Sequence, residues 1–263
     1  MKKWISRRLW FAAYFCSVML LGLLICSVQL VAQDVQTLLQ QGDAYYEQLD
    51  NAKALVEYEK AYQLAPDDFG VLMRLTRSCN NVGEDIDSDD SKPYFERAVE
   101  YAETMLEKYP DKAETHYFLS VSYGNLAMFT GGKTKVKLSR NVKEHAEKAI
   151  RLDPNHAESH VVLGIYYREI ANLNRVLKAF AKVFFGGLPG GSNEDAERSF
   201  LKALELKPDY INAHFQLAKT YEKMKDKDKA IAQYEQVLEL PIHDHQDQAI
   251  KTKAEKQLSE IKK

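Results

Sequence analysis

The chain has 263 residues, of which 45% are hydrophobic and 28% charged, and its formal net charge at pH 7 is −2. This composition is typical of globular proteins and excludes a wholly disordered chain. The slightly acidic balance makes nucleic acid a poor partner.

Residues 1–32 have the pattern of an export signal. Four cations in MKKWISRR precede an almost wholly apolar run at 9–28, and small residues follow in VAQ. We expect cleavage after Ala32. Because about 20 apolar residues can span a bilayer, retention of residues 9–28 as an inner-membrane anchor is the alternative. The expected location is therefore periplasmic or secreted. Only Cys79 lies beyond the signal, so no internal disulfide is expected.

Similar phrases that end in proline recur along the rest of the chain. They are YEKAYQLAP, ETMLEKYP, EKAIRLDP, LKALELKP and YEQVLELP, ending at Pro66, Pro110, Pro154, Pro208 and Pro241. The steps of 44, 44, 54 and 33 residues fit one unit of about 34 residues, with insertions of roughly ten, ten and twenty in repeats two to four. The insertions fall between the first and second helix of a repeat.

Within each unit, small and aromatic residues alternate in the register of a tetratricopeptide repeat (TPR). In the first unit these are Leu38, Gly42, Tyr45, Ala54, Tyr58, Ala61 and Pro66. Small residues such as Gly42 let paired helices approach closely, and aromatic rings fill the remaining gaps. We expect an all-α, TPR-like α-solenoid of about five helix pairs, preceded by the signal or anchor helix. The expected repeats are 33–68, 69–112, 113–156, 157–210 and 211–242, with a capping helix at 243–263.

From Thr115 to about Pro241 the chain resembles the regulator of microtubule dynamics family. The resemblance is carried by VKEHAEKAIRLDP, by HVVLGIYY with the following IANL, by the insertion through VFFGG, and by FLKALELKPDY through the LP at 240–241. It implies stacked helical pairs and no catalytic motif. It also implies a membrane-associated adaptor that touches microtubules or organelle contacts.

The stretch AMFTGGKT at 127–134 matches the loose form of a phosphate-binding loop, which makes a nucleotide hydrolase using Lys133 a hypothesis to weigh. Such a loop needs a strand behind it, and the sequence predicts none. We interpret Gly131 and Gly132 as the end of a helix. A solvated basic turn that could dock an acidic partner is then formed by Lys133, Lys135, Lys137 and Arg140.

Two groups of carboxylates and histidines have the spacing of metal ligands. Asp85, Asp87, Asp89 and Glu96 match a calcium loop, but Asp90 stands where that loop needs glycine. We expect a hydrated turn before a helix instead. His243 and His245, with Asp244 and Asp247, lie in a polar turn, where we expect no metal.

His116, His160 and His214 recur at one position of successive repeats. Equivalent residues of stacked repeats are at least about 8–10 Å apart, too far for one zinc ion. We interpret them as packing residues, and we expect no cofactor, metal or catalytic residue in the chain.

The concave face of the array is the predicted partner-binding groove, because first-helix residues line it in this repeat family. These residues are Leu39, Asp43, Tyr46, Met73, Arg77, Asn80, Tyr117, Val121, Ile165, Arg168, Phe215, Lys219 and Glu222. Aromatic and apolar anchors beside charges suit a protein or peptide ligand. No two of these residues form a pattern typical of a catalytic nucleophile and its general base.

The longest insertion, NLNRVLKAFAKVFFGGLPGGSNED, is amphipathic. It is predicted either to pack on its neighbour, with Ser192 or Asn193 capping the next helix, or to form an apolar lip of Phe180, Phe184 and Phe185 for a peptide, a lipid or the membrane surface.

The sequence therefore predicts an exported, non-catalytic scaffold that binds a protein or peptide partner in its concave groove. One alternative is a small-molecule or lipid carrier, such as an accessory subunit of a transporter. The other is a membrane-anchored adaptor like the family that the chain resembles.

Overall fold

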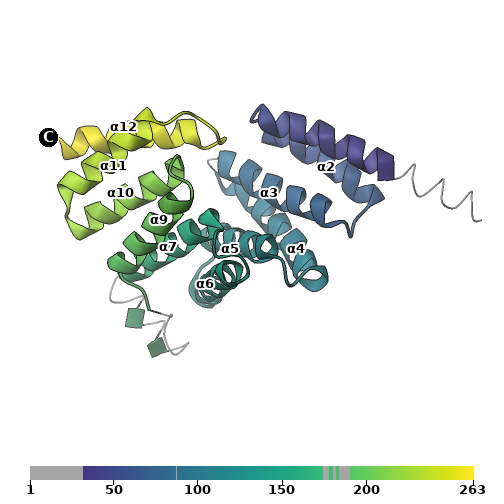
Figure 1. The fold of residues 1–263 in the computed structure, drawn as a ribbon. Coiled ribbons are helices and arrows are strands. Elements are labelled where there is room, and N and C mark those ends of the chain that lie inside the picture. Colours follow the sequence, from purple (N-terminus) through teal and green to yellow (C-terminus); the bar gives the residue numbers. More distant parts are fainter. Residues whose placement is uncertain (1–31, 87, 174–177, 180–181, 184–189) are drawn as a thin grey trace, which may run out of the picture. The chain divides into compact units, whose positions relative to one another are not determined.

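The computed structural model describes residues 32–86, 88–173, 178–179, 182–183 and 190–263. All regular secondary structure in these ranges is helical, without a strand (Figure 1), so the all-α prediction is confirmed there. No helix in the described ranges is both long and apolar enough to cross a bilayer. The expected export signal and the phenylalanines of the expected lip lie outside the described residues.

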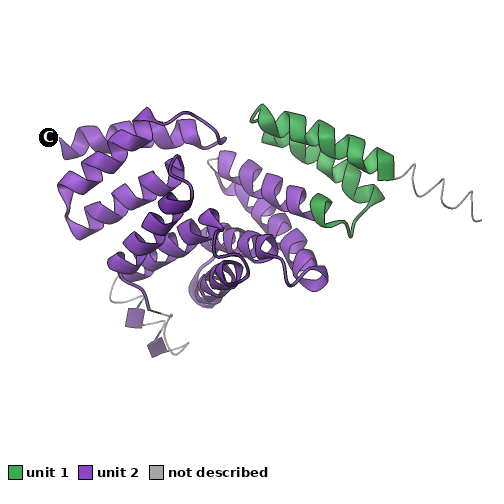
Figure 2. Cartoon of the chain, in the orientation of Figure 1, with its two compact units in different colours: residues 1–71 green, residues 72–263 purple. Residues whose placement is uncertain are grey.

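The chain forms two compact units, residues 1–71 and 72–263 (Figure 2). The described part of unit 1 contains a helix over residues 32–47 and α2 (Asn51–Leu64). The two helices approach closely, since a Cβ added to Gly42 would overlap the fully buried ring of Tyr58. The Tyr58 hydroxyl donates a 2.7 Å hydrogen bond to Asp43 Oδ1, which fixes the pair.

Unit 2 is a run of helices, and from residue 92 onward each described α-helix packs on the next along the chain. The helix α3 (Phe69–Asp85) begins at the boundary between the units. The others are η1 (Asp89–Ser91), α4 (Lys92–Lys108), α5 (Ala113–Met128), α6 (Gly132–Leu152), α7 (Ala157–Ala171), α9 (Asn193–Leu206), α10 (Ile211–Met224), α11 (Lys227–Glu239) and α12 (Asp247–Ile261).

The second helix of each repeat ends two residues before a proline, as predicted. This holds for α2, α4, α6, α9 and α11, which precede Pro66, Pro110, Pro154, Pro208 and Pro241. Proline cannot donate the next helical hydrogen bond, and it disfavours helical angles in the residue before it.

Close contacts between glycine and an aromatic ring also set the spacing of helices within unit 2. A Cβ added to Gly164 on α7 would lie 2.6 Å from Phe200 Cε1 on α9, and Phe200 is fully buried. The same distance separates a Cβ added to Gly83 from Phe95 Cε1. The predicted role of small residues facing rings is therefore confirmed at these positions.

The recurring histidines have a second role besides packing. In each, Nε2 lies next to the carbonyl oxygen of the proline six residues earlier, at 2.8 Å for His116, 3.2 Å for His160 and 2.9 Å for His214. Because a carbonyl only accepts, Nε2 carries the proton and donates. These bonds tie the start of each first helix to the end of the preceding repeat.

His116 also stacks on His145 of α6, with Nδ1 atoms 2.9 Å apart. Since neutral His116 carries its proton on Nε2, His145 must donate from Nδ1. Burial is the main cause that lowers the pKa of both imidazoles below the ordinary 6.5. The neutral pair is thus the form that fits this site.

The interpretation of the Gly131–Gly132 pair as the end of a helix is wrong. α5 ends at Met128, Gly131 is the N-cap of α6, and Gly132 is its first residue, with φ +53°. The lysines that follow therefore lie in the first turns of α6, not in a loop. The buried side chains of Val136 and Leu138 hold this segment against the protein.

The end of the longest insertion has the predicted cap. Ser192 is the N-cap of α9 and accepts from Asp195 N at 3.0 Å, while Asp195 Oδ2 accepts from Ser192 N at 3.0 Å. This reciprocal pair is a capping box, which satisfies backbone donors at the start of the helix.

Candidate partner-binding site

The predicted groove residues lie on the first helix of each pair. Leu39, Asp43 and Tyr46 lie on the helix over residues 32–47 in unit 1, where Leu39 is buried. The remainder belong to unit 2: Met73, Arg77 and Asn80 on α3, Tyr117 and Val121 on α5, Ile165 and Arg168 on α7, and Phe215, Lys219 and Glu222 on α10. Only some of them reach a common cavity.

Asn80 belongs to a buried network of hydrogen bonds between α3 and α5. It is 2% exposed, and its Nδ2 donates to Ser122 Oγ at 2.9 Å and to the Thr76 carbonyl at 3.0 Å. Asn125 Nδ2 donates to Asn80 Oδ1 at 3.1 Å and to Glu84 Oε1 at 2.8 Å. The amide of Asn80 is thus used within the fold.

Arg168 is likewise held by the protein itself. Its side chain is 3% exposed, and Nη1 donates to the carbonyl and to Oε1 of Gln216 at 3.1 and 2.8 Å. Its ionic partner is the exposed Glu169, with Nη2 3.1 Å from Oε1. Gln216 in turn donates a hydrogen bond to Asn212 Oδ1 at 3.0 Å. This buried guanidinium fixes α7 against α10 and places a positive charge behind the cavity wall.

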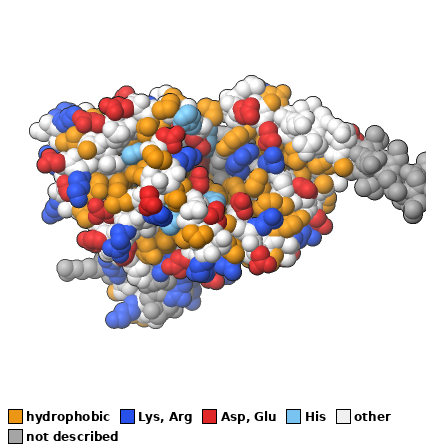
Figure 3. All heavy atoms as spheres, viewed as in Figure 1, with side chains coloured by type: hydrophobic (Ala, Val, Ile, Leu, Met, Phe, Trp, Pro, Cys, Tyr) orange, Lys and Arg blue, Asp and Glu red, His pale blue; other side chains and the backbone are white. Residues whose placement is uncertain are grey.

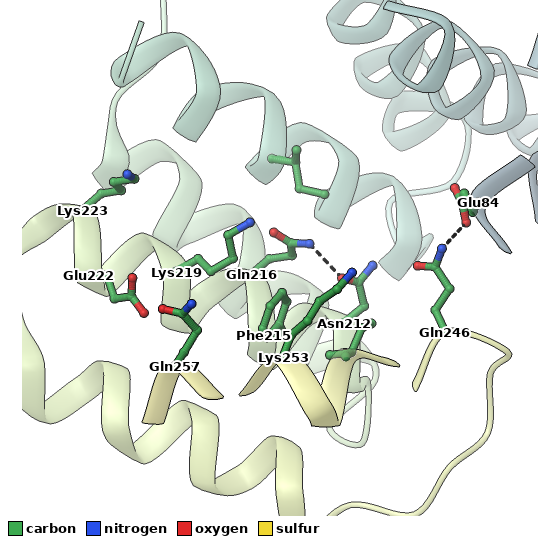
Figure 4. A pocket seen from close by; sticks show the side chains of 12 residues that line it. Glu84, Asn212, Phe215, Gln216, Lys219, Glu222, Lys223, Gln246, Lys253 and Gln257 are labelled. Atoms are coloured by element: carbon green, nitrogen blue, oxygen red, sulfur yellow. Dashed lines mark hydrogen bonds between the residues drawn. The ribbon is translucent and has the colours of Figure 1, made fainter. Parts of the chain in front are cut away.

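A cavity of about 590 Å³ lies where α7, α10 and α12 meet the end of α3 (Figure 4). Its apolar wall includes Phe215, whose ring is 7% exposed, and Ile165. The full lining is Glu84, Ile165, Asn212, Phe215, Gln216, Lys219, Glu222, Lys223, Gln246, Ile250, Lys253 and Gln257. In Figure 4, residues of α10 face Lys253 and Gln257 of α12 across this space.

The cavity is lined by three lysines and two glutamates. Lys219, Lys223 and Lys253 form no ion pair with any carboxylate in the described part of the chain. The ammonium of Lys219 lies 5.6 Å from the centre of the Phe215 ring. Burial, and then the neighbouring charge of Arg168, lower the pKa of Lys219 from its ordinary value.

Both carboxylates of the lining already accept hydrogen bonds. Glu222 Oε1 accepts from the hydroxyl of Tyr234 at 2.6 Å, and Glu84 Oε2 accepts from Gln246 Nε2 at 2.6 Å. Protein surrounds Glu84 on most sides although its side chain keeps 26% exposure, and burial raises the pKa of its carboxyl. The two donors, the Tyr234 hydroxyl and the Gln246 amide, are uncharged, so the hydrogen bonds do not neutralise the carboxylates, and the lining has three lysines against two glutamates.

The segment between α11 and α12 contacts the far end of α3. His245, with a side chain 6% exposed, places Nδ1 2.8 Å from Asp85 Oδ1, next to the bond between Gln246 and Glu84. These contacts join residues 160 positions apart in the sequence. They close one end of the cavity, and sequence reasoning missed them because no repeat pattern connects the two segments.

The metal patterns do not assemble into a site within the described ranges. No group of three or more histidine, cysteine or carboxylate side chains there could hold a metal ion. Asp85 instead faces His245, Glu96 pairs with Lys92 at 3.1 Å, and Asp89 lies in η1 after a Ser88 cap. Asp87 is outside the described residues. Asp247, expected in a polar turn, is buried and accepts from the backbone of His243 and Asp244 at 2.8 Å.

Charges of both signs are interspersed over the face seen in Figure 3, without a continuous basic field. A nucleic-acid surface needs such a field.

Comparisons with known proteins identify relatives of the chain. The family model for Regulator of microtubule dynamics protein 1-3 matches residues 38–262. Regulator of microtubule dynamics protein 1 of Bos taurus is 30% identical over 229 residues, which cover 84% of this chain and 70% of that protein. Regulator of microtubule dynamics protein 2 of Homo sapiens is 25% identical, with coverage of 75% and 48%.

A solved structure, that of a thermophilic TPR protein of Thermus thermophilus, superposes with a TM-score of 0.64. The two are 22% identical, and the match covers 86% of this chain and 99% of the other. This similarity shows a TPR-like helical array.

Proposed function

Because the chain belongs to the regulator of microtubule dynamics family, we propose that it is a non-catalytic helical-repeat scaffold that binds a segment of a partner protein. The cavity on the first-helix side of unit 2 supports this function. There Phe215 and Ile165 provide apolar side chains, while Lys219 provides an ammonium group that forms no ion pair with the described residues. Protein interfaces combine aromatic anchors with polar groups in this way. The names of the relatives describe regulators rather than enzymes, which is consistent with a scaffold.

Site-specific photocrosslinking in cells tests this function. A photoreactive amino acid at Gln257, which lines the cavity, should trap a discrete partner protein. The matched control is Lys256, which is exposed on the same helix but does not line the cavity. Lys219→Glu, introduced into the chain that carries the photoreactive amino acid at position 257, should reduce the amount of trapped product. Equal products from both positions, unchanged by Lys219→Glu, would exclude the cavity as the binding site.

We also propose that the chain is exported, with cleavage after Ala32 or retention of the run at 9–28 as an anchor. The support is the sequence pattern of cations, apolar run and small residues. Cell fractionation with amino-terminal mass spectrometry tests both forms. A chain that begins at Gln33 or a full-length chain in the membrane fraction is expected. A full-length chain in the soluble fraction would contradict export.

A further inference from the structure

The lining of the cavity contains three lysines, which come from α10 and α12. Lys219 and Lys223 are four residues apart on α10, so their side chains lie on one face of the helix, where like charges repel. Arg168 adds a third positive charge behind Lys219. Lys253 approaches from α12 on the opposite wall (Figure 4).

The remaining polar groups of the lining strengthen the preference for an anion. Gln216 donates to Asn212 and accepts from Arg168, so the two amides are oriented by the fold. The amide of Gln257 faces the same space. Amide and ammonium donors together recognise carboxylates, because hydrogen bonds to a charged acceptor are shorter and stronger than neutral ones.

We propose that this cavity binds an acidic segment of the partner protein, with aspartate or glutamate carboxylates on Lys219, Lys223 and Lys253 and the aliphatic part of the segment against Phe215. The proposal rests on the proposed scaffold function and names the chemistry of its ligand. Charge complementarity carries it: the lining has three lysines against two glutamates, and none of the three ammonium groups forms an ion pair in the described chain, although Glu169 and Glu222 act on Lys219 at longer range. A volume of about 590 Å³ lies within the range of sites that enclose a small ligand or a short peptide stretch.

Fluorescence anisotropy with two labelled peptides tests the proposal on the purified chain. One peptide alternates glutamate and glycine, and the other has glutamine at each glutamate position. The glutamate peptide should bind at least about tenfold more tightly, and its affinity should fall as salt increases. Equal binding of the two peptides would overturn the proposal.

Substitutions then locate the binding. Lys219→Gln and Lys253→Gln should each weaken binding of the glutamate peptide by about tenfold or more, which is the change expected for loss of one charged hydrogen bond. Lys219→Arg should retain binding, and the control Lys256→Gln should stay within about twofold. Circular dichroism of each variant verifies folding. Unchanged affinity in folded Lys219→Gln and Lys253→Gln would place the peptide elsewhere and overturn the proposal.

Competition and crosslinking distinguish a carboxylate site from a phosphate site, and failure of this proposal from failure of the scaffold function. Inorganic phosphate should displace the glutamate peptide only at concentrations where chloride does so too, and selective displacement by phosphate would overturn a carboxylate site. If the Gln257 crosslink forms in cells but the glutamate peptide does not bind, the scaffold function stands and the acidic ligand is refuted. If neither occurs, both fail.

Discussion

Replacement of Gly164 by alanine tests whether a glycine–ring contact limits how closely α7 and α9 pack. The added Cβ would lie 2.6–2.9 Å from three atoms of the Phe200 ring, which is fully buried. Removing glycine from a helix interior stabilises by about 1 kcal/mol, whereas overpacking a core costs about 1–3 kcal/mol. Because the Phe200 ring is fully buried, we expect a cost in the upper part of this range, about 2–3 kcal/mol, and hence a net loss of about 1–2 kcal/mol, or roughly 2–8 °C in Tm.

Gly124 provides a matched control on α5. A Cβ added there would meet only Val142 Cγ2, at an ordinary 3.8 Å, so Gly124→Ala should stabilise by about 0.5–1 kcal/mol. Urea denaturation followed by circular dichroism measures both variants. Adding Phe200→Leu to Gly164→Ala should recover part of the lost stability, because the smaller side chain makes room. Equal stabilisation by both alanines would refute the importance of this contact.

Three further outcomes are expected. Acidification should destabilise unit 2: the folded-state pKa of His116 and of His145 is lowered, so their contribution to stability is complete above pH 6.5 and is lost as the pH falls below it. Between neutral pH and a pH below 6.5, the urea midpoint should fall less for His145→Gln than for the wild-type chain. An identical fall in both would contradict the assignment of this pH dependence to the histidine pair. Ser192→Ala should cost about 1 kcal/mol through loss of the capping box, with Ser192→Thr close to wild type in the same assay. Asn80→Ala should cost about 1–3 kcal/mol in the same assay, because the Thr76 carbonyl and the Ser122 hydroxyl lose a donor and the Asn125 amide loses an acceptor. An unchanged urea midpoint would contradict this role of the Asn80 amide.

Much of the fold could be predicted because local residue types determine it. A proline cannot continue a helix beyond its first turn, so the prolines after α4, α6 and α9 allowed the ends of these helices to be read from the sequence. The contact between Gly164 and Phe200 follows from the repeat register. The start of α6 was misread because Gly131 and Gly132 commonly end helices, whereas here Gly131 is an N-cap.

The cavity was only partly predictable. Ile165, Phe215 and Lys219 lie at expected groove positions and line it. Lys253 and Gln257 were missed because they lie on α12, and repeat periodicity carries no information on how a terminal helix packs. Arg168 was expected as an accessible groove residue, and the structure buries it. Its burial depends on Gln216, which lies 48 positions later in the sequence.

The bonds from His245 and Gln246 to the end of α3 affect how the array unfolds. In a linear array of repeats each unit is stabilised only by its immediate neighbours, so a terminal helix can fray independently. Here the departure of α12 also removes polar contacts from Asp85 and Glu84, near the opposite end of unit 2. We therefore expect loss of structure at the carboxyl terminus to be transmitted across the unit, and its melting to be more cooperative than that of an open chain of helix pairs.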